Sequence, residues 1–247
     1  PVFIDSDYKT WNMNPEVLEA AFEKYPNVKA VLVVHLYGLS ADMDRIIAIA
    51  EKYNIPIIED CCHTLLSTYH GRRVGSFGIG VFYSFEWGKP IVAGIGGSLI
   101  VNDPALREKV NNDYRSYRLP GIITQAKIEI QYQAFRFLYR PSFFWPVRTL
   151  FHWLGDSHII ESNYNPVGKE GIAKDFSLRI APLVKRRLKK RLLSIDKIFK
   201  HSQYVSDQYR NRIQSNCVTH PDIPQDCDIV FARYPLLTKN KQKLLSN

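Results

Sequence analysis

The first half of the chain alternates between helical and strand patterns of apolar residues. Residues 15–24 have a helical pattern, with Asn14 as the N-cap and Pro15 at the first helical position, where proline is well tolerated. An unbroken run of β-branched residues and leucine at 30–35 predicts a strand that is buried on both faces. Helical periodicity returns at 42–53, so helix, strand and helix follow one another.

The same rhythm continues through the next sixty residues. A second apolar strand at 56–59 ends at Asp60, and further strands are predicted at 80–85 and 98–101 before a helix at 104–114. This alternation predicts an α/β fold with a mostly parallel sheet flanked by helices. Ligands bind beyond the carboxyl ends of the strands in such sheets. We therefore look for a site at Asp60 and in the segment that follows the strand at 80–85.

The second half of the chain is rich in aromatic and basic residues. Residues 131–155 contain nine aromatic side chains, with three arginines between them: Arg136, Arg140 and Arg148. A helical pattern then runs from Pro182 to about Ile213, and its segment 185–200 holds eight basic residues and one acidic residue. We therefore expect the second half of the chain to have a different role from the first half.

Charge divides the chain in the same way. The full sequence has 33 Lys and Arg against 24 Asp and Glu, a net charge of +9. Residues 1–110 carry 10 basic and 13 acidic residues, a net of −3, whereas residues 111–247 carry 23 and 11, a net of +12. Three interpretations compete for segment 131–200: a packed interface with a solvated basic face, an anionic membrane surface, or nucleic acid. Nucleic acid is the least favoured partner, because no recognition motif accompanies the charge.

The composition is that of an ordinary globular protein in a reducing compartment. Two of the four cysteines, Cys61 and Cys62, are adjacent, and no Cys or His spacing suits zinc, so we expect neither a disulfide framework nor a metal site. We find no signal-peptide pattern and no apolar run of about 18 residues, and we expect a cytoplasmic protein. The chain opens at Pro1 in what has the pattern of a domain interior, so we interpret it as part of a longer protein.

Three segments carry candidate chemistry, in a fixed order along the chain. The first is IIEDCCHT at 57–64, a strand that ends at Asp60 and is followed by His63. The second is GRRVGSFGIGVFYSFEWGKP at 71–90, and the third is the glycine turn and strand GIGGSLIVND at 94–103. The segments VVHLYG and ADMD precede them.

This ordered set resembles the DegT/StrS-type nucleotide-sugar aminotransferases, which are pyridoxal-phosphate enzymes of the aspartate-aminotransferase fold. The resemblance is dense from residue 1 to about residue 115 and continues weakly in DFSLRIAP at 175–182, which is similar to the family's Asn-x-Arg segment. FARYPLL at 231–237 resembles the start of the family's small domain. The resemblance implies an amino-acid donor such as glutamate, a keto-sugar nucleotide acceptor, a role in polysaccharide biosynthesis and a homodimer.

The chemistry of the candidate residues agrees with that resemblance. A transaminase of this kind needs a lysine that binds the cofactor covalently and shuttles a proton, and Lys89 is the candidate. A carboxylate such as Asp60 would keep the cofactor's pyridine nitrogen protonated. By resemblance, His63 would contact the cofactor ring or its oxygen, and Ser84 would donate to its phosphate.

Each of these residues also has a purely structural interpretation. Lys89 alone would be a solvated surface lysine, and Asp60 alone would be a turn residue or a helix N-cap. His63 could be a hydrogen-bonded core histidine, and Ser84 could be a small strand residue. The order of the motifs favours the cofactor roles for all four, with Lys89 as the catalytic residue.

The sequence departs from the family pattern at three positions. Pro90 stands where the family usually has Asn after the lysine, and Ile95 stands where its glycine turn has Asp or Glu. Ser177 replaces the Asn that in the family reaches a neighbouring subunit's cofactor phosphate, whereas Arg179 is kept. Relatives that dehydrate sugars have histidine in place of the lysine, so Lys89 favours transamination.

We divide the chain into three parts on these grounds. Residues 1–130 are predicted to form part of the large cofactor-binding domain, and residues 131–180 an aromatic and basic insertion with its connector. Residues 181–247 are predicted to form a long helix and the start of a smaller C-terminal α/β domain. The alternative function is that of a non-catalytic relative acting as a peripheral-membrane or assembly component through residues 131–200.

Overall fold

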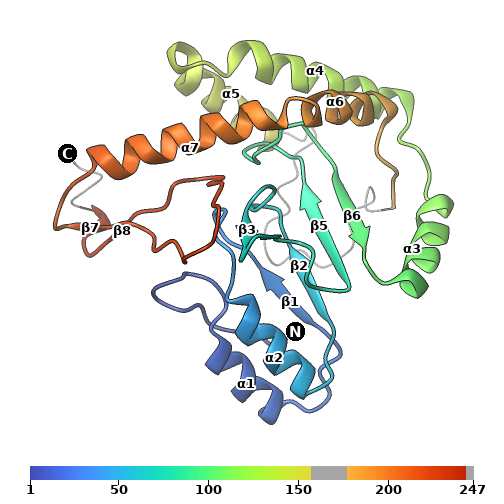
Figure 1. Ribbon diagram of the computed structural model, residues 1–247. Coiled ribbons are helices and arrows are strands. Elements are labelled where there is room, and N and C mark those ends of the chain that lie inside the picture. The colour runs from blue at the N-terminus through green and yellow to red at the C-terminus, as the bar shows by residue number, and fades with distance from the viewer. Residues whose placement is uncertain (157–176, 243–247) are drawn as a thin grey trace.

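The computed structural model describes residues 1–156 and 177–242 and contains a four-stranded sheet of order β1-β2-β5-β6 (Figure 1). The strands are β1 (Val31–Val34), β2 (Ile57–Asp60), β5 (Gly80–Ser84) and β6 (Gly97–Val101). Strands β1, β2 and β5 are parallel, and β6 is antiparallel to β5. The prediction of an α/β fold with a mostly parallel sheet is confirmed.

Three helices of the first half begin at a side-chain cap that the sequence encodes locally. In α1 (Pro15–Lys24), the Asn14 side chain accepts from the first backbone N–H groups, as predicted. Asp42 caps α2 (Met43–Lys52) in the same way. Asp103 caps α3, which comprises Pro104–Ser116.

The main core lies between the sheet and the pair of helices α1 and α2. Leu18 and Ile46 from these helices pack against Val33 of β1 in one buried cluster. The expectation that the first strand is buried on both faces is wrong, because Leu32 of β1 is 47% exposed. The helices α1 and α2 cover one face of β1, and the side chains of successive strand residues point to opposite faces.

A layer of helices lies above the sheet in the view of Figure 1. It comprises α4 (Ile122–Leu138), the short 3₁₀ helix η1 (Pro141–Phe143), α5 (Phe144–Asp156), α6 (Pro182–Leu192) and α7 (Ile195–Arg212). The helical pattern that begins at Pro182 is therefore two helices and not one. The break falls at Ser194, whose φ of −110° and ψ of 20° interrupt the helical backbone.

One short hairpin and one further pair of short antiparallel strands complete the described structure. They are β3 (Thr68–Tyr69) with β4 (Arg72–Arg73), and β7 (Val218–Thr219) with β8 (Leu237–Thr238). Residues 157–176 of the predicted insertion lie outside the described residues, as do residues 243–247. The predicted domain boundaries stay predictions.

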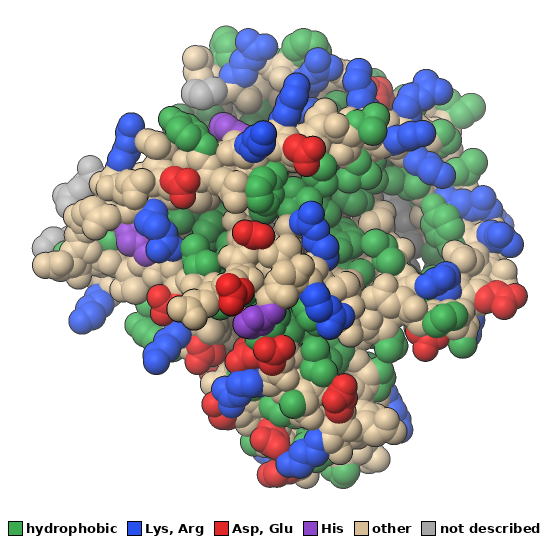
Figure 2. All heavy atoms as spheres, in the orientation of Figure 1, with side chains coloured by type: hydrophobic (Ala, Val, Ile, Leu, Met, Phe, Trp, Pro, Cys, Tyr) green, Lys and Arg blue, Asp and Glu red, His purple; other side chains and the backbone are tan. Residues whose placement is uncertain are grey.

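The surface shows the charge division of the sequence. In Figure 2, red acidic side chains gather over the lower part of the molecule, where α1 and α2 lie, and blue basic side chains spread over the top and right. None of the helices in the described ranges has the length and hydropathy needed to cross a bilayer.

Candidate active site

Two of the four predicted site residues end neighbouring parallel strands. Asp60 is the last residue of β2 and pairs in register with Phe82 of β5, and Ser84 ends β5 two residues later. Asp60 Oδ1 accepts from the Cys62 N–H at 2.9 Å, and Ser84 Oγ accepts from the Glu86 N–H at 3.5 Å. Both polar side chains therefore lie at the carboxyl edge of the sheet, where ligands bind in such folds.

A buried carboxylate directly before Asp60 fixes this edge. Glu59 is fully buried, and its oxygens accept three backbone N–H bonds, each of 2.7 Å, from Gly75, Phe77 and Gly78. His35 Nε2 lies 3.2 Å from the same carboxylate, and His35 Nδ1 accepts from the Ala41 N–H. Burial alone would raise the pKa of Glu59, but His35 and the backbone donors outweigh it and lower this pKa.

The trio of His35, Glu59 and Cys61 brings three potential metal ligands together in the core. The histidine nitrogens and the carboxylate oxygens are already engaged in hydrogen bonds. Burial raises the pKa of the Cys61 thiol, so it stays protonated and is a poor ligand. We assign these three residues to the folding of the sheet edge.

Lys89 lies in a loop that begins after β5. Gly88 has a φ of +76°, which favours glycine, and the Lys89 N–H donates to the Glu86 carbonyl at 3.3 Å. Trp87 packs against α4, with ring centroids 4.4 Å from Phe135 and 6.1 Å from Tyr132. The aromatic pattern near residue 131 thus supports the loop that carries Lys89.

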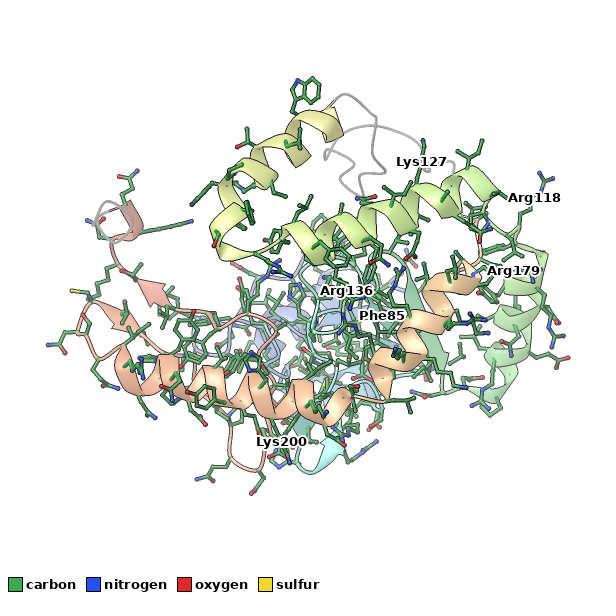
Figure 3. The ribbon with its side chains drawn as sticks, turned by 90° about the horizontal axis from the view of Figure 1, so that it is seen from above. Phe85, Arg118, Lys127, Arg136, Arg179 and Lys200 are labelled. Atoms are coloured by element: carbon green, nitrogen blue, oxygen red, sulfur yellow. The ribbon has the colours of Figure 1, made fainter. Side chains whose placement is uncertain are left out.

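Helix α6 holds the same loop from a second direction. Arg187 Nη1 donates to the Ala93 carbonyl at 2.7 Å, and the guanidinium forms an ion pair with Glu129. The guanidinium also lies 3.4 Å from the centroid of the Tyr132 ring. Phe85 lies between α4 and α6 in Figure 3 and belongs to a buried cluster with Ile91, Ala93, Ile128 and Val184. The Lys89 loop is therefore clamped by two helices.

His63 is influenced by three charged residues of the site. Burial lowers its pKa, and the positive charges of Lys89 and Arg233 lower it further, against the opposing effect of Asp60. Its Nδ1 atom is buried and has no hydrogen-bond partner among the described residues. An orphaned buried nitrogen in a polar site is typical of a place that a ligand completes. The structure thus brings Asp60, His63 and Lys89 together, with Ser84 at the same edge.

Three further residues lie at this place that the sequence did not predict there: Tyr37, Cys62 and Arg233. The Tyr37 ring lies 6.3 Å from the His63 ring, and burial raises the pKa of the Cys62 thiol to about 12. Arg233 approaches from the far end of the chain, with Nη2 3.2 Å from the position that a Cβ of Gly88 would occupy. Tyr37 and Arg233 stand in segments that the sequence had marked, VVHLYG and FARYPLL, but no local pattern indicated that they meet.

The retained arginine of the Asn-x-Arg-like segment has a structural contact within the chain. Arg179 Nε donates to the Tyr117 carbonyl at 2.7 Å, and its Nη2 donates to the Arg115 carbonyl. Arg118 and Arg179 lie close together in Figure 3, and their backbones share a bridge hydrogen bond of 2.8 Å. The Arg179 side chain therefore caps the C-terminal end of α3.

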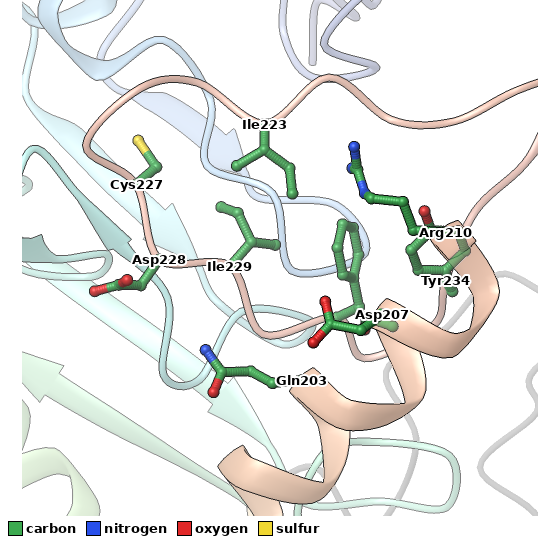
Figure 4. A pocket seen from close by; sticks show the side chains of 10 residues that line it. Gln203, Asp207, Arg210, Ile223, Cys227, Asp228, Ile229 and Tyr234 are labelled. Atoms are coloured by element: carbon green, nitrogen blue, oxygen red, sulfur yellow. The ribbon is translucent and has the colours of Figure 1, made fainter.

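A hollow of about 300 Å³ lies between α7 and residues 221–234 (Figure 4). Its polar lining is largely engaged: Arg210 donates to the Pro221 carbonyl at 3.0 Å, and the Tyr234 hydroxyl is 2.8 Å from His220 Nδ1. None of the four predicted site residues is part of its lining. We therefore place the candidate active site at the sheet edge and not in this hollow.

Comparison with curated proteins finds relatives that match about half of this chain. The chain is 41% identical over 121 residues to a dTDP-3-amino-3,6-dideoxy-α-D-galactopyranose transaminase of Aneurinibacillus thermoaerophilus, a match covering 48% of this chain and 33% of the relative. It is 41% identical over 110 residues to the spore coat polysaccharide biosynthesis protein SpsC of Bacillus subtilis (strain 168), covering 44% of this chain and 28% of the relative.

Solved structures extend the likeness to the whole described fold. A DegT DnrJ EryC1 StrS aminotransferase from Brucella abortus superposes with a TM-score of 0.69 and 25% identity, covering 100% of this chain and 55% of that one. The chain thus spans about half the length of this solved relative, and the match to each curated relative spans a third of that relative or less. The sequence family described as DegT/DnrJ/EryC1/StrS aminotransferases matches residues 1–139, more than half of the chain, and the chain belongs to this family.

Proposed function

We propose that the whole protein is a pyridoxal-phosphate-dependent aminotransferase that moves an amino group from an amino acid, glutamate, to a keto-sugar nucleotide in polysaccharide biosynthesis. One observation carries the proposal: Asp60 ends β2 at the carboxyl edge of the sheet, and the charges of Asp60 and Lys89 both act on His63, whose buried Nδ1 has no partner among the described residues. The names of the relatives, a dTDP-sugar transaminase and a polysaccharide biosynthesis protein, support the substrate class.

The donor set at the sheet edge fits this family's cofactor, pyridoxal phosphate. Asp60 offers a carboxylate that can pair with a protonated ring nitrogen, and Ser84 offers a hydroxyl that can donate to phosphate. His63 offers a buried nitrogen without a protein partner among the described residues. The cofactor, when bound, supplies an electron sink for the substrate carbon.

The residues of this chain would divide the work by their chemistry. Lys89 Nζ is the amine that holds the cofactor and then carries the proton at the substrate carbon. Asp60 holds a proton at the ring nitrogen by charge pairing, and its own position is fixed by the Cys62 N–H. Burial and the charges of Lys89 and Arg233 lower the pKa of His63, which favours its neutral form, and Nδ1 can contact the cofactor.

A matched pair of variants tests the role of Lys89. Lys89→Arg keeps the positive charge but removes the amine nucleophile, so the visible absorption of lysine-bound pyridoxal phosphate should vanish and amino transfer should fall by about 10³-fold or more. Lys29→Arg, at an exposed lysine, is the control and should behave as wild type. If Lys89→Arg keeps both signals, the assignment of Lys89 is wrong. If the wild-type protein itself shows neither signal, the alternative of a non-catalytic relative is favoured.

The donor and acceptor are tested separately from the cofactor. The protein with bound pyridoxal phosphate should lose the visible absorption of the lysine-bound cofactor when glutamate is added. Addition of a keto-sugar nucleotide should then restore this absorption. Glutamine and aspartate serve as comparison donors. A response to either comparison donor but not to glutamate would exclude glutamate while leaving the aminotransferase proposal intact.

Two further properties belong to this proposal. We propose a homodimer, on the basis of the family resemblance, and light scattering of the whole protein tests it. We also propose a cytoplasmic location, which the four free cysteines support. Blocking free thiols before cell lysis and counting the blocked cysteines by mass spectrometry tests whether the cysteines are reduced in the cell.

An exposed group of side chains at the turn from α4 to α5 supports a membrane-surface contact. This aromatic corner comprises Phe137, Leu138, Tyr139, Phe143 and Trp145, and Trp145 is 68% exposed. Exposed Arg140 lies between these residues in the sequence, exposed Arg136 and Arg148 flank them, and residues 131–155 contain no Asp or Glu. Arg136 lies near the turn in Figure 3, where α5 leaves the end of α4 at an angle.

We propose that the aromatic corner binds the surface of an anionic bilayer, because aromatic rings beside arginines suit the headgroup region. The double variant Phe143→Ser/Trp145→Ser should lose co-sedimentation with phosphatidylglycerol vesicles, and wild type should bind phosphatidylcholine vesicles weakly. Tyr204→Ser, at an exposed tyrosine of α7, is the control. Unchanged vesicle binding, or dissociation of a dimer instead, would overturn the membrane proposal.

A further inference from the structure

We propose that Arg233 is a binding residue for the anionic group of a substrate at the Lys89 site, either the carboxylate of an amino-acid donor or the diphosphate of a sugar nucleotide. This inference rests on the proposed function of the site. Arg233 lies outside the segment that matches the family and comes from the far end of the described chain.

The position of Arg233 places its charge beside the Lys89 loop. Its Nη2 atom is 3.2 Å from where a Cβ of Gly88 would lie, directly before Lys89. Gly88 has a positive φ, so this position favours glycine, and the lack of a side chain leaves room for the guanidinium. Arg233 and Lys89 also act together on His63, which places all three at one site.

Backbone contacts fix the segment that carries Arg233. The Ala232 N–H donates to the Tyr37 carbonyl at 2.9 Å, and the Val230 N–H donates to Ser67 Oγ at 3.0 Å. Gly38 permits this docking: its φ is +111°, and a Cβ there would lie 2.2 Å from the Val230 carbonyl oxygen. The chain therefore enters the Arg233 position from a docked, buried segment and not from a free loop.

The charges that act on His63 favour an anion there, whereas a second carboxylate of the Lys89 loop, Glu86, acts on the neighbouring Cys62. Lys89 and Arg233 bring two positive charges to His63, against one carboxylate, Asp60. Arg233 is exposed, and no ion pair involves it within residues 1–156 and 177–242. An exposed guanidinium beside a second cation is a suitable partner for carboxylate or phosphate, which it binds through two parallel N–H bonds.

The first test uses His63 as a reporter and does not depend on activity. In the whole protein without cofactor, nuclear magnetic resonance should show His63 titrating below the usual value of about 6.5. Glutarate or pyrophosphate, as probes of the two anion classes, should raise this pKa by neutralising Arg233. In Arg233→Gln, the His63 pKa should already be higher and should not respond to either probe.

Matched variants make this test specific. Arg212→Gln removes the same charge at the exposed end of α7 and should leave the His63 titration and its response to anions as in wild type. Arg233→Lys keeps the charge but not the paired donors, so the pKa should stay low while anions bind more weakly. An anion response that persists in Arg233→Gln would overturn the inference, whatever the outcome of the Lys89 test.

The second test separates the two sources of the anion by kinetics. Arg233→Gln should raise the KM of one substrate by about 10- to 100-fold, as expected for loss of a charged hydrogen bond, with a smaller change in kcat. A change in the KM of glutamate identifies the carboxylate, and a change in the KM of the sugar nucleotide identifies the diphosphate. Unchanged KM values for both substrates would contradict the proposal.

Discussion

The strand region, residues 1–103, and the helical layer from α4 to α7 are stabilised in different ways. The strand region buries polar groups and satisfies them, as the Glu59 carboxylate shows with its three backbone donors and His35. In the helical layer, α7 has no buried residues, α6 buries only Val184, and α4 buries Ile128 and Tyr132. The strand region is therefore built to hold a site, and the helical layer is built to present a surface.

The two regions meet at the loop that carries Lys89. Trp87 packs against the aromatic rings of α4, and Arg187 of α6 donates to the Ala93 carbonyl. The helical layer thus contributes to the site by holding the loop, without placing any of the four predicted site residues itself. Substitutions in the two regions should therefore differ in how much they lower the free energy of unfolding.

The largest effect on stability is expected in the strand region, from Glu59→Gln. The amide nitrogen would replace an oxygen that accepts from both Gly75 and His35, and donors would face donors in the core. We expect a loss of about 3 kcal/mol in the free energy of unfolding, measured with urea. The control Glu51→Gln, at an exposed residue of α2, should have little effect.

The pH dependence of this loss has a defined sign. Because the pKa of Glu59 is lowered on folding, its contribution is fully present above the ordinary value of about 4.5 and is lost as the pH falls through the folded pKa. The difference between wild type and Glu59→Gln should therefore narrow below that pH. A constant difference would show that the charge of Glu59 is not the cause.

A smaller effect is expected from the contact between the regions. Arg187→Met removes the bond to the Ala93 carbonyl and leaves Glu129 without its ion pair, so we expect a loss of about 2 kcal/mol. Affinity for pyridoxal phosphate, measured by fluorescence titration, should also fall because the loop loosens. Arg186→Met, the exposed neighbour, is the matched control, and equal effects of the two variants would refute the clamp.

The smallest effect on stability is expected at the aromatic corner. Phe143 and Trp145 are largely exposed, so Phe143→Ser/Trp145→Ser should change the free energy of unfolding by less than about 0.5 kcal/mol. Thermal and urea unfolding of the double variant measure this change. A loss comparable to that of Arg187→Met would mean that the corner is part of the packed structure and not a free surface.

Local signals in the sequence were sufficient for most elements of the strand region. Asn14 marked the start of α1, and the apolar run ending at Asp60 placed the edge of the sheet. The exposure of Leu32 was not predicted, because which faces of a strand are covered depends on helices elsewhere in the chain. The break at Ser194 was also missed, since the helical periodicity continues through it.

The candidate site residues were predicted only where motifs are continuous in sequence, and their roles stay predictions. Asp60 and His63 lie three residues apart in one segment, and Lys89 follows the next strand along the sheet. Arg233 and Arg187 reach the site through tertiary contacts whose sequence separations carry no periodic signal. Such residues become visible only when the fold brings their elements together.

The most direct test of the central claim is to locate the cofactor on the chain. The whole protein is incubated with pyridoxal phosphate, reduced with borohydride, digested and mapped by mass spectrometry, with Lys89→Arg treated in parallel. We predict that the added mass lies on the peptide containing Lys89 and is absent from the variant. Stoichiometric labelling of another lysine, with Lys89 unmodified, would contradict the assignment of the active site to this edge of the sheet.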